Sequence, residues 1–159
     1  MTEKRSTQSI GADLTRRETF QAWTRISVRY NDLDPLGHVN NAAMAVFLEQ
    51  ARCELITPQL KTGGRHLDMV IASTTLEYLA ELRYPGDVEV GTLATRIGSK
   101  SFALVHGCFQ NGRCAGTGSV VMVVFDLDQR TSVAIPADVR PLIEALLASG
   151  PAPTADTGW

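Results

Sequence analysis

The segment 30–41, with the sequence YNDLDPLGHVNN, places chemically capable side chains directly before an apolar helix. It holds two carboxylates, Asp32 and Asp34, the imidazole of His38 and two adjacent asparagines, and the apolar run 42–48 follows without a break. A carboxylate can attack a carbonyl carbon or act as a general base on water. Backbone N–H groups at a helix N-terminus can stabilise the oxyanion that forms. The segment therefore predicts a site for attack on a carbonyl group.

The two carboxylates of this segment are expected to have different roles. Asp34 is a candidate catalytic group, whose charged form the helix dipole would favour. Its neighbour Pro35 also fits an ordinary turn, because Asp-Pro pairs are common in turns. Asp32 is expected to be a turn carboxylate that pairs with Arg29.

The imidazole and the two amides of the segment each have a structural alternative. His38 could orient Asp34 or a water molecule, act as an acid toward the leaving group, or only hydrogen-bond to the turn. Asn40 or Asn41 is expected to cap the helix by accepting a first-turn N–H. Either asparagine could also contact a substrate.

Composition and charge limit the partners that this chain is expected to bind. The 159 residues are 44% hydrophobic and 20% charged, which indicates one globular domain. A net charge of −2 predicts no binding to nucleic acid or to an anionic membrane. The three cysteines have no CxxC spacing, so neither a zinc site nor a disulfide framework is expected. No membrane span or signal peptide is recognised, and the expected location is the cytoplasm.

The elements that must position these side chains begin with one strand and one helix. Residues 1–19 are polar and predict a flexible tail. The alternation over 21–30 predicts a half-buried strand, in which Trp23 breaks the pattern and could cover an edge or an interface. The helix is expected to end near Ile56, because Pro58 follows. Its second half, which includes Glu49 and Arg52, should regain a face toward water.

Four further strands are predicted at 69–79, 87–97, 101–109 and 114–125. Short turns at 84–87, 98–100 and 111–112 predict antiparallel pairing between neighbours in the sequence. An extended piece at 131–135, a helix with apolar residues from Val139 to Leu147, and a flexible tail at 149–159 complete the chain. We therefore expect a single α+β domain over 20–148, with one long helix against one antiparallel sheet of about five strands.

These residues carry a resemblance to a known family. The pattern Tyr-x-Asp-x-Asp-x-x-x-His-Val-Asn-Asn, followed by a helix containing Leu48-Glu49-Gln50-Ala51-Arg52, resembles hotdog-fold acyl-CoA thioesterases of the 4-hydroxybenzoyl-CoA thioesterase type. The similarity extends from about Ala22 to Ile135. It implies a hotdog fold, in which a curved antiparallel sheet wraps a central helix. It also implies hydrolysis of acyl-CoA without a metal or other cofactor, in a homodimer or a dimer of dimers with active sites between protomers.

The resemblance also implies roles for individual residues. Asp34 matches the catalytic carboxylate of the family, which acts as nucleophile or as general base. Asp34 and His38 match two members of an Asp-x-Asn-x-His arrangement in related plant acyl-carrier-protein thioesterases, but Leu36 replaces its Asn, so that version of the mechanism is not expected. Substrate contacts are expected from Asn40 and Asn41, and the oxyanion would be held by helix N-terminal N–H groups.

Two other functions are compatible with the same fold. An acyl-CoA hydratase or dehydratase needs a catalytic histidine and a carboxylate on the helix, which His38 and Glu49 could supply. A binding or regulatory hotdog domain would hold acyl-CoA without turnover. Glu49 itself is expected to be a solvated helix residue, and His106 is expected to be a core histidine with its hydrogen bonds satisfied. Neither the serine-hydrolase elbow nor a nucleotide-binding glycine motif is present.

Overall fold

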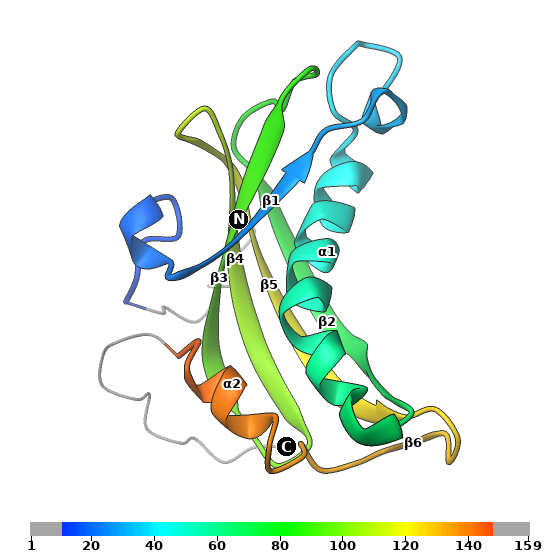
Figure 1. Cartoon of the computed structure of the whole chain (residues 1–159). Coiled ribbons are helices and arrows are strands. Elements are labelled where there is room, and N and C mark those ends of the chain that lie inside the picture. The colour runs from blue at the N-terminus through cyan, green and yellow to red at the C-terminus, as the bar shows by residue number, and fades with distance from the viewer. Residues whose placement is uncertain (1–10, 148–159) are drawn as a thin grey trace, which may run out of the picture.

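The computed structural model describes residues 11–147, in which one antiparallel sheet curls around one long helix (Figure 1). The strand order is β1-β3-β4-β5-β2, and the short strand β6 pairs with β5. The strands are β1 (Ala22–Ser27), β2 (Leu67–Tyr78), β3 (Asp87–Ile97), β4 (Ser101–Gln110), β5 (Arg113–Asp126) and β6 (Thr131–Ser132). The predicted α+β hotdog architecture is confirmed, and the sheet has six strands where about five were expected.

The long helix α1 (Asn41–Leu60) begins where the sequence predicts. Asn40 is its N-cap, since the Oδ1 atom accepts a hydrogen bond from the Ala42 N–H at 2.8 Å. The predicted end near Ile56 is wrong, because the helix continues through Pro58 to Leu60. Ile56 and Leu60 are both fully buried, so their packing stabilises a last turn in which proline removes only one N–H donor.

The second half of α1 differs from the predicted wet face at one position. Glu49, Gln50 and Glu54 are exposed as expected, but Arg52 is only 5% exposed. Residues four apart lie on the same side of a helix, and Arg52 lies midway between the buried Leu48 and Ile56. It therefore faces the sheet, and its burial is a correction to the sequence prediction.

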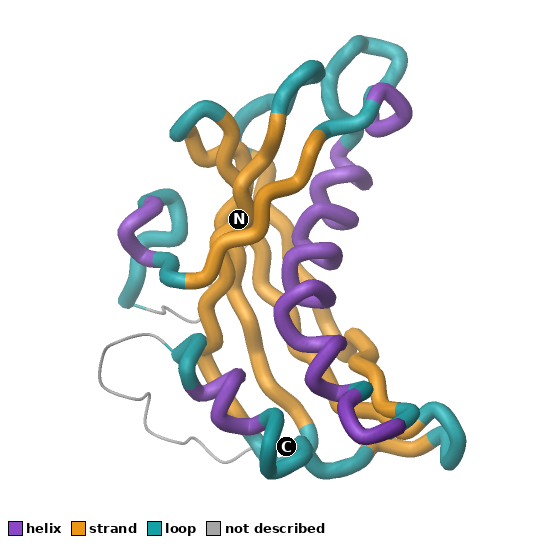
Figure 2. The backbone as a smooth tube through the Cα atoms, viewed as in Figure 1, coloured by secondary structure: helices purple, strands orange, loops and turns teal. Residues whose placement is uncertain are grey.

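The pairing of the strands agrees with the prediction except at β2. Strands β3, β4 and β5 pair antiparallel through the two short turns, as expected. β2 instead pairs with β5, while β3 pairs with β1. The segment 79–86 does not make a hairpin, because it crosses the end of the sheet, with Leu82 buried and its carbonyl accepting from the Val39 N–H at 3.0 Å. As a result β2 lies at the edge of the sheet, next to α1 (Figure 2).

Residues 11–19 have defined contacts, although the polar sequence predicted a tail over 1–19. The 3-10 turn η1 (Arg17–Thr19) leads to Phe20, which is buried with Phe109 on the outer side of the sheet. The Arg17 guanidinium lies 4.3 Å from the Trp23 ring centroid and ion-pairs with Glu89 at 2.8 Å. Trp23 thus covers the outer face of the sheet. Residues 1–10 of this predicted tail and all of the predicted 149–159 tail lie outside the described residues.

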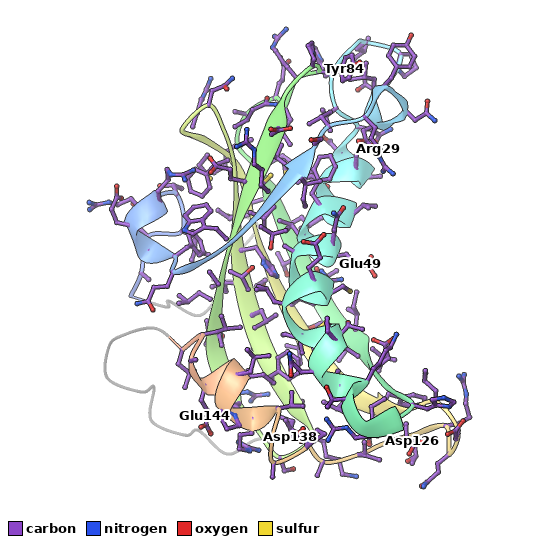
Figure 3. All side chains as sticks on the ribbon, viewed as in Figure 1. Arg29, Glu49, Tyr84, Asp126, Asp138 and Glu144 are labelled. Carbon is purple, nitrogen blue, oxygen red and sulfur yellow. The ribbon has the colours of Figure 1, made fainter. Side chains whose placement is uncertain are left out.

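The two ends of the sheet carry different features (Figure 3). Arg29 and Tyr84 lie at the end where α1 begins, whereas Asp126, Asp138 and Glu144 lie at the opposite end. At that opposite end the helix α2 (Arg140–Glu144) is shorter than the helical pattern over 139–147 predicts. Between residues 11 and 147, no helix has the length and apolar character needed to cross a membrane.

Candidate active site

The polar segment forms a closed turn between β1 and α1. Leu33 and Val39 make an isolated antiparallel bridge across it. Inside the bridge, the Asp34 N–H donates to the His38 carbonyl at 2.8 Å and the Gly37 N–H donates to the Asp34 carbonyl at 3.0 Å. Gly37 has φ +79°, a conformation that a residue with a Cβ rarely adopts. The turn thus fixes Asp34 and His38 relative to each other through backbone hydrogen bonds.

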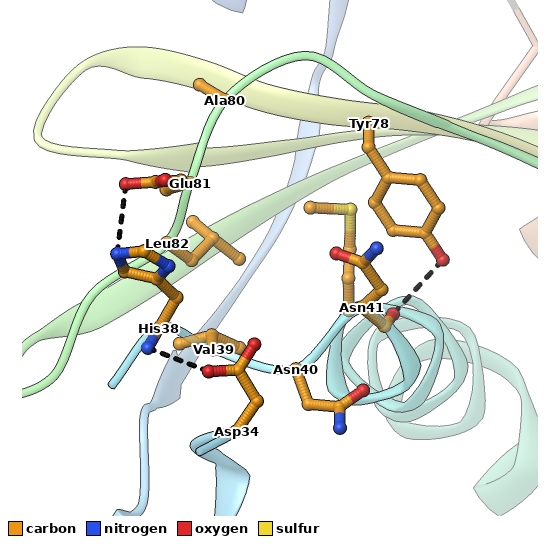
Figure 4. A pocket seen from close by; sticks show the side chains of 10 residues that line it. Asp34, His38, Val39, Asn40, Asn41, Tyr78, Ala80, Glu81 and Leu82 are labelled. Atoms are coloured by element: carbon orange, nitrogen blue, oxygen red, sulfur yellow. Dashed lines mark hydrogen bonds and ion pairs between the residues drawn. The ribbon is translucent and has the colours of Figure 1, made fainter. Parts of the chain in front are cut away.

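The Asp34 carboxylate has one anchored oxygen and one open oxygen. Oδ1 accepts hydrogen bonds from the Leu36 N–H at 2.9 Å and the His38 N–H at 3.2 Å. Oδ2 accepts none from the described part of the chain, and Figure 4 shows the carboxylate beside the space between His38 and Asn41. The backbone therefore sets the orientation of a half-buried carboxylate and leaves one of its oxygens available for chemistry.

A cavity of about 320 Å³, which we call the turn cavity, opens beside this carboxylate. Its walls come from the turn, the first helical turn of α1, the end of β2 and the segment after β2 (Figure 4). The structure brings all four predicted site residues to it. The lining residues are Asp34, His38, Val39, Asn40, Asn41, Met44, Tyr78, Ala80, Glu81 and Leu82.

The N–H groups at the start of α1 are mostly engaged by the cap. The Ala42 N–H donates to the Asn40 side chain and the Ala43 N–H donates to the Asn40 carbonyl, both at 2.8 Å. The Asn41 N–H has no acceptor among residues 11–147. Tyr78 donates its hydroxyl proton to the Asn41 carbonyl at 3.1 Å, which ties the first turn of α1 to β2. The Asn41 N–H is therefore the free first-turn donor beside the cavity.

Asp32 has the structural role that the sequence predicts. It is 6% exposed and accepts hydrogen bonds from the Arg29 N–H at 2.7 Å, Nε at 3.3 Å and Nη2 at 2.9 Å. Burial opposes ionisation of this carboxyl, but the hydrogen bonds and the charge of Arg29 outweigh burial and lower the Asp32 pKa. Both of its oxygens are thus occupied, in contrast to Asp34.

His38 has a partner that sequence reasoning missed. Its Nε2 atom lies 3.4 Å from Oε2 of Glu81, and the same oxygen lies 2.9 Å from Nη2 of Arg83. Glu81 belongs to the crossing segment after β2, and no spacing rule relates it to the turn. Only the unexpected path of that segment brings this carboxylate to the imidazole.

Other predicted combinations are separate in space. Glu49 is exposed and lines a different cavity farther along α1, so within one chain it does not form a pair with His38. In the part of the chain that the structure describes, no group of three or more His, Cys, Asp or Glu side chains is arranged to hold a metal ion.

Comparison with protein families supports the relationship that the motif indicates. The family model described as the thioesterase-like superfamily matches residues 28–143, which is more than half of the chain. The match includes the turn, α1 and strands β2 to β6. It therefore spans every residue that lines the turn cavity.

Solved structures show the same fold. The PA5185 protein of Pseudomonas aeruginosa is 29% identical with a TM-score of 0.78, covering 85% of this chain and 97% of that chain. A structure named as a predicted thioesterase from Bacillus stearothermophilus is 31% identical with a TM-score of 0.70, covering 81% and 98%. A thioesterase from Thermus thermophilus, solved with coenzyme A and Zn, is 32% identical with a TM-score of 0.65, covering 78% and 98%.

Proposed function

This chain belongs to the thioesterase-like superfamily, and from that membership we propose that it hydrolyses acyl-CoA thioesters to the free acid and coenzyme A. The observation that carries the proposal is the Asp34 carboxylate, with Oδ1 held by two backbone N–H groups and Oδ2 open beside the turn cavity. The Thermus thermophilus structure with coenzyme A supports CoA as the thiol.

The proposed reaction uses Asp34 in one of two ways. As a general base, its Oδ2 takes a proton from water while the water oxygen adds to the thioester carbonyl carbon. As a nucleophile, Oδ2 adds to that carbon itself and forms an anhydride that water then cleaves. In both cases the carbon–sulfur bond breaks and the thiolate leaves with the electron pair. Heavy-oxygen label entering Asp34 during a single turnover in labelled water distinguishes the nucleophilic route.

The remaining residues of the turn cavity have supporting roles in this proposal. The free Asn41 N–H, near the positive end of the α1 dipole, is suited to hold the oxyanion. The His38 imidazole can orient the attacking water or protonate the leaving thiolate, with Glu81 positioning the ring. Asn40 and Asn41 line the cavity and are proposed to contact the substrate.

A second copy of the chain is the proposed partner in assembly. β2 is an edge strand of twelve residues, and Val70 and Ile71 on it are 39% and 47% exposed. A long edge with exposed apolar side chains is typically covered by another strand, and β2 of a second copy would extend the sheet. Light scattering tests this assembly, since a monomer at micromolar concentration would contradict it.

The hydrolytic proposal is tested by an assay of thiol release from short, long and aromatic acyl-CoAs. We expect Asp34→Asn to lower kcat by about a hundredfold to ten-thousandfold, because the amide can neither accept the proton nor attack. Asp128→Asn is the matched control, because this carboxylate is 73% exposed and lies outside the turn cavity. Full activity in a folded Asp34→Asn protein would remove Asp34 from the mechanism. Tight acyl-CoA binding without turnover by the wild type would favour a binding domain.

A further inference from the structure

A second cavity, of about 80 Å³, lies between the middle of α1 and strands β2, β4 and β5. We call it the mid-helix cavity. Glu49 and Arg52 from α1 and His106 from β4 supply its ionisable groups. Apolar side chains such as Leu48 and Leu76 form much of the remaining wall, and Thr74 and Ser119 add hydroxyl groups to the lining. This cavity thus combines apolar walls with a small polar region.

Arg52 is a buried cation without a hydrogen-bonded partner at Nε. Its side chain is 5% exposed, and Nε has no acceptor among residues 11–147. The closest ion-pair contact, from Nη2 to Oε2 of Glu49, is 3.9 Å long, and the Glu49 side chain is 57% exposed. Burial lowers the pKa of Arg52, as expected for a cation that is poorly compensated. The free energy cost of such a charge falls when an anion pairs with it.

His106 adds a second unpartnered nitrogen to the same cavity. The residue is 1% exposed, and its Nδ1 atom lies 3.1 Å from Thr92 Oγ1. Its Nε2 atom has no partner among the described residues, which corrects the prediction of a satisfied core histidine. Burial, followed by the charge of Arg52, lowers the His106 pKa to about 3, so the ring is neutral at pH 7. A neutral ring adds no second positive charge to the cavity and offers one more hydrogen bond to a ligand.

The mid-helix cavity and the turn cavity lie along the same two elements. Asn41 and Met44 of α1 with Tyr78 of β2 line the first, and Ala45, Leu48 and Glu49 of α1 with Leu76 of β2 line the second. At 1.5 Å per residue, Glu49 lies about 12 Å along the helix axis from Asn41. The two cavities therefore follow one another along the seam between α1 and β2, with Asp34 beside the first and Arg52 beside the second.

We propose that the mid-helix cavity holds the far end of the acyl group and that Arg52 pairs with a carboxylate there. The expected substrates are CoA thioesters of dicarboxylic acids, and this inference rests on the proposed thioesterase function. A carboxylate supplies the negative charge that Arg52 lacks and can accept from Nε and an Nη atom together. In the tautomer that carries its proton on Nε2, His106 donates a hydrogen bond to the same carboxylate, while Nδ1 accepts from the Thr92 hydroxyl. The exposed Glu49 side chain can turn toward water, and Arg52 then pairs with the substrate carboxylate instead.

The test compares CoA thioesters of dicarboxylic acids with neutral acyl-CoAs of matched chain length. At one chain length we expect kcat/KM for the dicarboxylic substrate to exceed that of its neutral match by about tenfold to a hundredfold, as a charge-assisted hydrogen bond provides. Arg52→Met should abolish this preference, because kcat/KM for the dicarboxylic substrate should fall to that of its neutral match. Arg113→Met, an exposed arginine outside the cavity, should keep the preference. If Arg52→Met does not fold, Arg52→Gln replaces it.

Each failure has a separate meaning. Hydrolysis of neutral acyl-CoAs without a dicarboxylic preference at any length overturns the inference and leaves the thioesterase proposal standing. If no thioester is hydrolysed, calorimetric titration with adipate decides: binding by the wild type that Arg52→Met abolishes supports the carboxylate site, and no binding overturns it. Acetate bound as tightly as adipate indicates a site for any small anion and also overturns the acyl-end assignment.

Discussion

The turn cavity and the mid-helix cavity are both built on α1, but their polar groups are held in different ways. In the turn cavity, Asp34 is fixed by N–H groups two and four residues away, and Asn40 caps its own helix. In the mid-helix cavity, Arg52 and His106 come from different elements, and each has one nitrogen without a partner in the described part of the chain. Local hydrogen bonds therefore orient the polar groups of the turn cavity, whereas the mid-helix cavity keeps polar atoms without a partner among residues 11–147.

The first prediction tests how tightly the sheet is packed beneath each cavity. A Cβ at Gly116 would lie 2.7 Å from the Glu77 carbonyl oxygen and 2.6 Å from Met44 Sδ. A Cβ at Gly118 would meet the ends of the Leu48 and Leu76 side chains at 2.6 and 3.1 Å. Backbone of a paired strand moves less easily than a side-chain end. We expect Gly116→Ala to lower the free energy of unfolding by about 3 kcal/mol and Gly118→Ala by about 1 kcal/mol.

Urea denaturation of both variants measures this difference. Equal losses of stability would show that the sheet yields as easily beneath the turn cavity as beneath the mid-helix cavity. In that case packing would not distinguish the two regions.

The second prediction compares a paired buried charge with an unpaired one. Asp32→Asn should lower the free energy of unfolding at pH 7 by about 1–2 kcal/mol, because it removes charge-assisted hydrogen bonds from Arg29. Arg52→Met should leave stability unchanged or raise it by about 1 kcal/mol, because it removes a buried cation without a close partner.

The pH dependence of stability separates these two effects. The Asp32 pKa is lower in the folded protein than in the unfolded chain, so its stabilisation is present above the unfolded value of about 4. That stabilisation is lost as the pH falls through the lower folded value. Urea unfolding at a series of pH values should therefore show a shallower acid loss for Asp32→Asn than for wild type. Parallel curves would contradict the role given to Asp32.

The third prediction concerns the cap that closes the turn cavity. Asn40→Ala removes the acceptor for the Ala42 N–H and should lower the free energy of unfolding by about 1 kcal/mol. Asn40→Ser is the matched control, because serine also caps helices and should retain most of the stability. A loss as large in Asn40→Ser as in Asn40→Ala would mean that the asparagine side chain does more than cap.

A region could be predicted from the sequence when the interactions that form it are between residues close together in the chain. The sequence predicted three regions whose determinants are local, namely the turn from Asp32 to Asn41, the start of α1 and the strand β3 over 87–97. These determinants are a turn glycine, a helix cap and an alternating pattern. The pairing of β2 with β5 was not, because the crossing segment looks like a short turn in the sequence. The contact between His38 and Glu81 depends on that crossing and was missed with it.

The sequence by itself determined the fold class, the start of the long helix and the identity of the carboxylate proposed for catalysis. Periodicity, capping and the Asp-x-x-x-His-Val-Asn-Asn motif act within a few residues and can be read along the chain. Only the tertiary structure decided that Arg52 faces the sheet and lines the same cavity as His106. It also decided that, among the described residues, Asp34 has a partner on only one of its oxygens while Asp32 has partners on both. Burial and hydrogen-bond satisfaction depend on which distant segments pack together, and no local pattern records that.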